Sequence, residues 1–135
     1  MKKLLTLAAV AGSLILGAAP AQAADRLDGE ARLARMLEGR VAGEPVDCVD
    51  LRRVRSSSIS DNTAIVYDAG SVIYVQRPTA GAESLSDWDT MVNYPFGGRL
   101  CSIDTVRMVD PHSGMLRGIV FLDEFVPYRR VRDGR

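Results

Sequence analysis

The first strongly apolar segment of the chain lies at its beginning and shows no alternation with polar residues. Residues 4–19 carry no charge, Lys2 and Lys3 precede them, and the small residues of 20–23 follow them. A basic, an apolar and a small-residue region in this order are typical of a secretory signal peptide. We therefore predict a signal peptide over 1–23, cleaved before Ala24. The alternative is a single membrane anchor, but about 16 apolar residues are short for a hydrocarbon core of about 30 Å.

Apolar residues then recur with the period of a helix over 26–38. The pattern combines i, i+4 and i+7 spacing with further apolar positions beside it: Leu27, Ala31, Ala34, Leu33, Met36 and Leu37. Gly39 follows, where a left-handed residue commonly ends a helix. Residues 41–45 lose the period and contain a glycine and a proline, so this stretch is predicted to be a linker.

Beyond residue 45 the pattern changes to short segments rich in β-branched and aromatic residues. A hairpin is predicted most clearly, with strands 63–68 and 71–77 on either side of Gly70. Other strands are expected over 46–51, 56–60, 90–94, 105–110 and 118–122, with one helical turn within 84–89 and a last apolar segment at 125–128. The fold class is therefore expected to be mainly β (α+β). We predict a small antiparallel roll or barrel of about six to seven short strands, with the N-terminal helix over one opening or face.

Composition is consistent with one domain over 24–135. The chain has 135 residues, so the part after the leader is long enough for one modest core but too short for a doubly wound or barrel-type α/β enzyme. All eight aromatic residues lie between Tyr67 and Tyr128. This span is expected to carry the core, with Trp88 as a lid over it. The basic tail 129–135 is expected to be frayed.

The chain has two cysteines, Cys48 and Cys101. In an exported chain they predict one structural disulfide. Closing such a loop removes unfolded-state entropy worth roughly 4 kcal/mol. The alternatives are a redox pair and a thiolate metal site. Redox pairs usually form C-x-x-C motifs, and zinc needs more ligands than two distant cysteines and one histidine provide.

Several of these segments together resemble a known group of proteins. The sequence around Cys48 (C-V-D-L-R-R), the hairpin strands T-A-I-V-Y and V-I-Y-V, and L-C-S-I-D around Cys101 are similar to small exported bacterial proteins described only as a domain of unknown function. The resemblance covers about 46–128. It implies one disulfide-linked, β-rich, extracytoplasmic domain, and it transfers no catalytic or binding residue.

Some residues could carry chemistry, and each has an ordinary structural explanation. Asp110, His112 and Ser113 place an acid, an imidazole and a hydroxyl within four residues, but Pro111 and Gly114 favour a turn, and triad members normally come from separate segments. Asp87 and Asp89 flank Trp88, which suggests a sugar-binding surface or, more simply, a solvated loop. Asp47, Asp50, Asp104, Asp123 and Glu124 are scattered carboxylates without a calcium-loop motif. No catalytic residue, cofactor or metal site is predicted.

Two arginine clusters are the remaining feature of interest. They comprise Arg52, Arg53 and Arg55, and Arg129, Arg130 and Arg132. Guanidinium groups bind phosphate bidentately, so nucleic acid and phosphate-bearing lipid are the functional options. Because both lysines lie in the leader, the domain has a formal charge of −2, which does not resemble a nucleic-acid-binding protein.

These observations predict a periplasmic or secreted, non-catalytic domain that acts by binding or structural association in the cell envelope. Its partner would be an envelope protein or ligand, not nucleic acid, and no transmembrane segment follows the leader. One alternative is a small inhibitor-like module that blocks an envelope-degrading enzyme, which would present a loop with ordered polar side chains. The other is a small hydrolase that uses His112, which would need a carboxylate and a nucleophile beside it.

Overall fold

The computed structural model describes residues 21–132. One α-helix is followed by ten short strands and two 3-10 turns. They are α1 (Ala21–Met36), β1 (Arg40–Ala42), β2 (Cys48–Asp50), η1 (Leu51–Arg53), β3 (Ser56–Ser60), β4 (Ala64–Asp68), β5 (Val72–Gln76), η2 (Ala82–Ser84), β6 (Thr90–Val92), β7 (Arg99–Cys101), β8 (Thr105–Val109), β9 (Leu116–Phe121) and β10 (Phe125–Arg130). The predicted mainly β fold with one N-terminal helix is confirmed, although it has more strands than expected.

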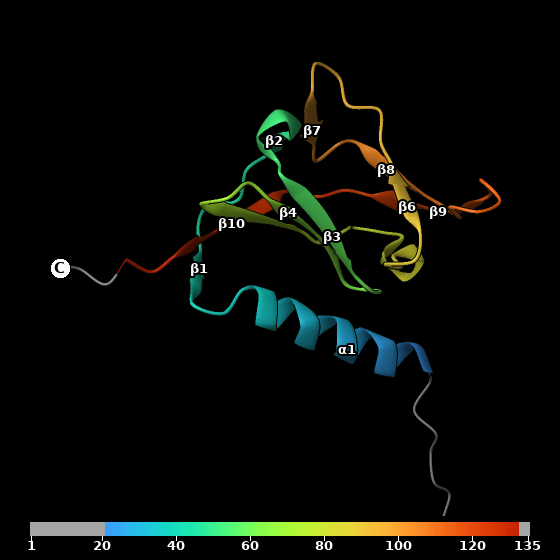
Figure 1. Cartoon of the computed structure of the whole chain (residues 1–135), viewed down its shortest axis with the longest axis horizontal. Helices are drawn as coiled ribbons and strands as arrows, with labels where there is room; N and C mark the ends of the chain where they lie inside the picture. Colours follow the sequence, from blue (N-terminus) through green and yellow to red (C-terminus); the bar gives the residue numbers. More distant parts are fainter. Residues whose placement is uncertain (1–20, 133–135) are drawn as a thin grey trace, which may run out of the picture.

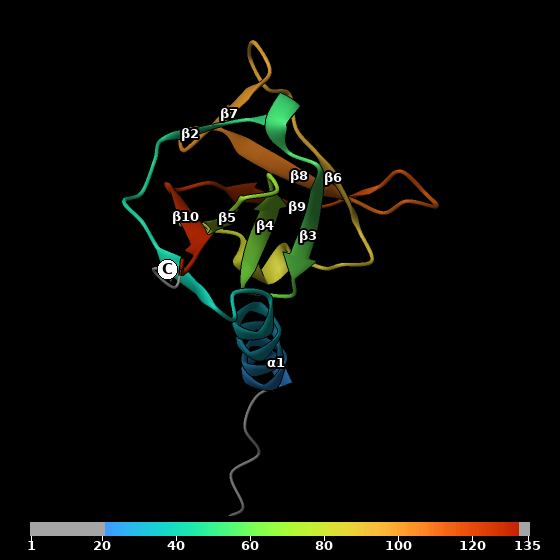
Figure 2. The ribbon, with the colours of Figure 1, turned by 60° about the vertical axis from the view of Figure 1, so that its left-hand side comes forward.

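The strands form three antiparallel sheets. A five-stranded sheet has the order β1-β10-β5-β4-β3, a two-stranded sheet pairs β2 with β7, and a three-stranded sheet has the order β6-β8-β9. The predicted hairpin is present as β4 and β5, with Tyr67 opposite Tyr74 and Gly70 at φ 84°. Figures 1 and 2 show α1 at one end of the molecule and the β2–β7 pair at the other. Among residues 21–132, no helix is both long and apolar enough to cross a bilayer.

The middle of the five-stranded sheet is buried on both faces. On β4, Ala64 and Val66 belong to a cluster with Leu33 of α1, whereas Ile65 and Tyr67 belong to the larger cluster on the other face. This follows from the alternation of side chains along a strand. The larger cluster is mainly aliphatic: Val49, Ile59, Ile65, Tyr67, Leu85, Leu100, Val106, Met108, Val120, Leu122 and Phe125. The helix, the large sheet and the two small sheets therefore form successive layers.

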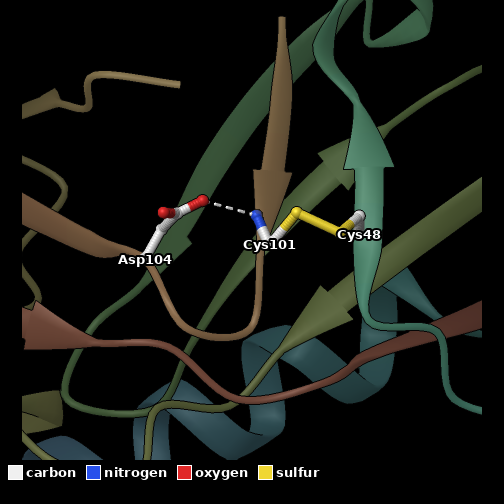
Figure 3. Close-up of a disulfide and its surroundings, with 3 residues drawn as sticks. All are labelled: Cys48, Cys101 and Asp104. Carbon is white, nitrogen blue, oxygen red and sulfur yellow. Dashed lines mark hydrogen bonds between the residues drawn. A yellow bond between two sulfur atoms is a disulfide. The ribbon is translucent and has the colours of Figure 1, made fainter. Parts of the chain in front are cut away.

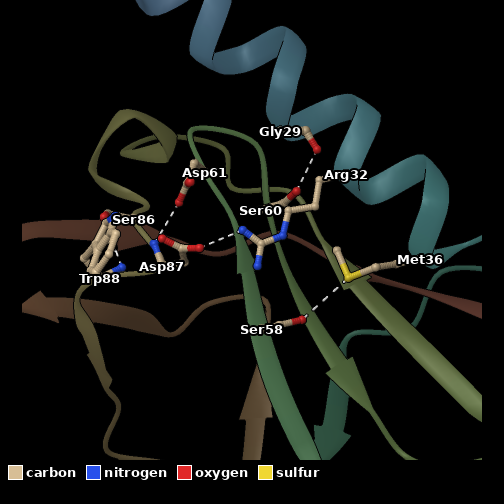
Figure 4. Close-up of polar contacts among 9 residues, drawn as sticks. All are labelled: Gly29, Arg32, Met36, Ser58, Ser60, Asp61, Ser86, Asp87 and Trp88. Atoms are coloured by element: carbon tan, nitrogen blue, oxygen red, sulfur yellow. Dashed lines mark hydrogen bonds and ion pairs between the residues drawn. The ribbon is translucent and has the colours of Figure 1, made fainter.

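Helix α1 rests on the large sheet through a close backbone approach. A Cβ atom at Gly29 would collide with the carbonyl oxygen of Asp61 and the hydroxyl of Thr63. The Ser60 hydroxyl, which is fully buried, donates to the Gly29 carbonyl oxygen over 2.6 Å (Figure 4). Arg77, just beyond β5, donates to both carboxylate oxygens of Glu30 over 2.6 and 3.0 Å. A glycine is thus required where the helix crosses the β3–β4 turn.

The structure corrects the boundaries predicted at both ends of the domain. Helix α1 extends over Ala21–Met36 rather than 26–38, because helix-favouring alanines precede residue 26. Cleavage before Ala24 would remove its first three residues. The rest of the predicted signal peptide, 1–20, lies outside the described residues.

The expected linker and the expected frayed tail partly pair with each other. Strand β1 overlaps the expected linker 41–45 at residues 41–42, and it places Ala42 opposite Tyr128 and Arg40 opposite Arg130. Arg129 and Arg130 therefore belong to β10 rather than to a frayed tail. Residues 133–135 of that tail lie outside the described residues.

The aromatic residues do not form the core as expected. Tyr67 and Phe125 are buried and meet edge to face with ring centroids 5.9 Å apart. Four other aromatic side chains are exposed: Trp88, Tyr94, Phe96 and Phe121. The span 67–128 does provide most of the buried core residues, as expected, but these residues are mainly aliphatic rather than aromatic.

Candidate functional site

The predicted disulfide joins two strands that face each other directly. Cys48 on β2 is opposite Cys101 on β7, with their Cα atoms 4.0 Å apart and an S–S distance of 2.08 Å. The Asp104 carboxylate accepts a hydrogen bond from the Cys101 amide over 2.7 Å (Figure 3). The Asp104 amide in turn donates to the Cys101 carbonyl oxygen over 3.0 Å. The disulfide and this turn fix the segment around β7. We call residues 48–53 and 93–104 the disulfide-linked end.

The loop between β6 and β7 ends in a tight two-glycine turn. The Arg99 amide donates to the Phe96 carbonyl oxygen over 3.2 Å, and Gly97 and Gly98 have φ of 62° and 75°. Positive φ at both central positions defines a hairpin turn that favours glycine. The Gly98 carbonyl oxygen also accepts from the Leu51 amide over 2.9 Å. The tip is therefore fixed to η1 as well as to the disulfide, and it projects from the molecule (Figures 1 and 2).

This fixed segment carries exposed apolar side chains. Phe96 is 97% exposed, Ile103 90% and Tyr94 79%. Scattered single apolar residues are normal on a protein surface. Here three of them lie within ten consecutive residues whose backbone is held by a disulfide and hydrogen bonds. Aromatic residues on a rigid support are the usual energetic anchors of binding surfaces.

A groove of about 450 Å³ lies beside the disulfide and contains an excess of positive charge. Three arginines and one carboxylate line it, and they are Arg52, Arg53, Arg99 and Asp50. The Asp50 carboxylate accepts from Nε and Nη2 of Arg52, both over 2.9 Å. These bonds lower the pKa of Asp50, and both of its carboxylate oxygens are bound to Arg52. Within residues 21–132, no carboxylate oxygen lies within 4.0 Å of the Arg53 or Arg99 guanidinium.

Arg55 belongs to the same cluster in the sequence but has a local structural role. Its guanidinium lies against Gly70, where an added Cβ would come within 2.9 Å of Cζ. Its amide donates to the Asp68 carbonyl oxygen over 2.7 Å. The second predicted cluster divides as well, because Arg129 and Arg130 are on β10 while Arg132 follows it. The structure brings Arg99 to the first cluster, an arrangement that the sequence does not indicate.

Trp88 is 83% exposed, so the prediction that it covers the core is wrong. Its two acidic neighbours point to different parts of the fold. Asp87 binds Arg32 of α1 over 2.7 Å, and its amide donates to the Asp61 carboxylate over 2.7 Å (Figure 4). Asp89 lies 3.7 Å from Arg117 on β9. These carboxylates serve to attach the loop to the helix and the small sheet.

His112 lies in the exposed β8–β9 turn. The Asp110 carboxylate accepts from the backbone amides of His112 and Ser113, both over 2.9 Å. These two bonds lower the pKa of Asp110. The carboxylate is thus used to cap the turn, as the proline and glycine of this segment predict, and it is not directed at the imidazole.

The carboxylates considered as cation ligands are dispersed. Asp50 binds Arg52, Asp104 binds the Cys101 amide, and Asp123 accepts from the Glu124 amide over 2.8 Å. Within the described part of the chain, no three His, Cys, Asp or Glu side chains gather as a metal site would require. A second groove, of about 650 Å³, lies between α1, the β3–β4 turn and η2, with side chains of both charges along it.

Comparisons of the chain with protein-family models, with curated proteins and with solved structures found no match. The resemblance to a domain of unknown function therefore stays a prediction. The function is therefore inferred from the geometry of the described residues, and the sequence pattern does not single out Tyr94, Phe96 or Ile103. The phenylalanine between a proline and two glycines indicates a side chain on a turn, but not whether another segment packs over that turn.

Proposed function

We propose that this protein is an exported, non-catalytic binding domain of the cell envelope, which contacts its partner through the disulfide-linked end. The observation that carries the proposal is the 97% exposure of Phe96 on a two-glycine tip fixed by hydrogen bonds to Arg99 and Leu51. An aromatic ring exposed to water is unfavourable for the isolated domain. Its burial against a partner contributes to binding, and a fixed tip loses little conformational entropy when it binds.

Export is the second part of the proposal. The leader over 1–23 and the Cys48–Cys101 disulfide both support it, since structural disulfides persist mainly in oxidising compartments. Mass spectrometry of the protein from the envelope of the expressing bacterium is expected to find Ala24 at the N-terminus. A chain that retains Met1 in the cytoplasm would contradict this part.

Site-specific photo-crosslinking tests the proposed contact surface. A photoreactive phenylalanine analogue is placed at Phe96 or, as the matched control, at Trp88. Both positions carry highly exposed aromatic side chains, but only Phe96 is on the disulfide-linked end. We expect one discrete adduct from position 96 in the envelope fraction and none from position 88. Equal labelling at both positions, or labelling at position 88 alone, would contradict the proposed surface.

The two alternatives receive less support from the same geometry. An inhibitor-like module would project ordered polar side chains, whereas the β6–β7 loop projects Tyr94 and Phe96. A hydrolase that uses His112 would need a partner carboxylate, whereas Asp110 accepts two backbone amides. The exposed tip therefore favours a binding domain in the broader sense.

A further inference from the structure

The disulfide-linked end combines apolar and cationic side chains within a short stretch of surface. Arg99 directly follows the two-glycine tip, and Phe96 forms a bridge with it across the turn. The Arg52 side chain lies beside Gly98, because an added Cβ there would be 3.7 Å from both Cδ and Nε. Arg53 is next in η1 and lines the same groove as Arg99. Exposed apolar side chains at the tip thus lie next to the arginines of one groove at its base.

Two arginines of this groove, Arg53 and Arg99, have no carboxylate partner among residues 21–132 and can bind an anion. Arg99 is opposite Asp50 in the β2–β7 register, but the Asp50 carboxylate is bound to Arg52. Arg53 and Arg99 can therefore offer their planar donors to phosphate oxygens, which guanidinium groups bind in pairs. The apolar side chains of the tip and the arginines at its base would then bind a target in which an apolar region lies next to a layer of phosphate groups.

We propose that the disulfide-linked end docks on an anionic phospholipid surface, with Phe96 and Tyr94 inserted at the level of the headgroups and Arg53 and Arg99 on lipid phosphates. Aromatic side chains are favoured at this depth of a bilayer, and arginine remains charged while its stem lies on apolar surface. The inference rests on the proposed binding function and specifies its partner. A protein partner for the same surface is an outcome of the test.

The formal charge of −2 on the domain does not oppose this contact. At physiological ionic strength, interactions between exposed charges are screened beyond about 8 Å. The electrostatic attraction to an anionic lipid surface therefore depends on the charges nearest to it, and in the groove these are three arginines and one aspartate.

Vesicle flotation of the full exported chain, without its leader, tests the proposal. The probes are vesicles of phosphatidylcholine alone and vesicles that contain about one third phosphatidylglycerol. We expect flotation with the anionic vesicles only, weakened by added salt. R53Q and R99Q are each expected to lower the partition coefficient about fivefold. F96S is expected to lower it about tenfold or more, and F96W to retain it.

Matched control variants show whether the effect belongs to this end. R35Q removes an exposed arginine of α1, and W88S removes the exposed aromatic residue of another loop. Neither is expected to change flotation. Because all of these side chains are exposed, circular dichroism and thermal unfolding should show that every variant folds as the wild type does.

Each other outcome overturns the lipid proposal in a recognisable way. Flotation that R53Q, R99Q and F96S leave unchanged would assign binding to a different surface. Chemical-shift changes at these arginines with inorganic phosphate, but no flotation, would show an anion site only. No flotation together with a protein adduct at position 96 would refute the lipid target while the proposed function stands. No flotation and no adduct would refute both.

Discussion

Replacing both cysteines by alanine is expected to lower the free energy of unfolding by about 4 kcal/mol. Cys48 and Cys101 are 53 residues apart in the sequence. In the chain-entropy model, closing a loop of this length lowers the entropy of the unfolded chain by about 14 cal/mol/K. This raises the free energy of the unfolded chain by about 4 kcal/mol at 25 °C. This is a large share of the 5–15 kcal/mol typical of a whole domain.

The structure also indicates which strands lose protection from hydrogen exchange first when the disulfide is removed. Strands β2 and β7 have three residues each and form a sheet of their own, and an isolated pair of strands is marginally stable. Strands β4 and β5 instead occupy the interior of the five-stranded sheet, buried on both faces. Amides of 99–101 and of 105–121 are therefore expected to exchange before those of 64–76. The amides of β10 are expected to exchange as late as those of the large sheet, because β10 lies between β1 and β5 in that sheet.

Urea unfolding and hydrogen exchange measure these two effects. The reduced wild-type chain is the matched control, because it lacks the bond but keeps both cysteine side chains. It should resemble C48A/C101A in the free energy of unfolding. A loss below about 1 kcal/mol would mean that the unfolded chain is already compact around this loop. Exchange of 64–76 as early as 105–121 would refute the assignment of the large sheet as the more stable unit.

Three further predictions concern the attachment of α1 to the large sheet. L33A removes a side chain that is 1% exposed and should cost about 2–5 kcal/mol in urea unfolding, whereas L27A, at a position 71% exposed on the same helix, should cost almost nothing. G29A should destabilise by about 1–3 kcal/mol by overpacking, and a gain from its higher helix propensity would contradict the close approach. Two hydrogen bonds from Arg77 hold the pKa of Glu30 below its ordinary value of 4.5, so the pair stabilises the fold above that pH. The difference between wild type and E30Q, up to about 1 kcal/mol at neutral pH, should vanish as the pH falls through the lowered pKa.

The sequence predicted those elements whose side-chain pattern is decided locally. The β4–β5 hairpin was predictable because β-branched and aromatic residues fill both strands around Gly70. The disulfide was predictable because two cysteines allow one intramolecular pairing. Strand β1 overlaps the predicted linker 41–45, because three residues followed by a flexible glycine show no alternation. It becomes a strand only because β10 provides a partner 88 residues further along the chain.

The candidate site depends on the packing of segments that are distant in the sequence. Aromatic side chains usually indicate a core, and this led to the expectation that Trp88 covers it. The burial of Phe96 or Trp88 is decided by whether another segment packs over the turn that carries them, and composition contains no such information. The convergence of Arg99 with Arg52 and Arg53 likewise follows from the β2–β7 register.

We propose that the disulfide-linked end, and not another exposed surface, contacts the envelope. Trp88 is the only tryptophan of the chain, so W88F/F96W moves the single indole fluorophore from one exposed loop to the tip of the other. On addition of native envelope membranes, the emission of W88F/F96W is expected to shift to the blue and to become protected from an aqueous quencher. The wild-type emission, from Trp88, is expected to remain that of an indole in water. A blue shift for Trp88 with an unchanged spectrum for the tryptophan at position 96 would contradict the assignment of the disulfide-linked end as the contact surface.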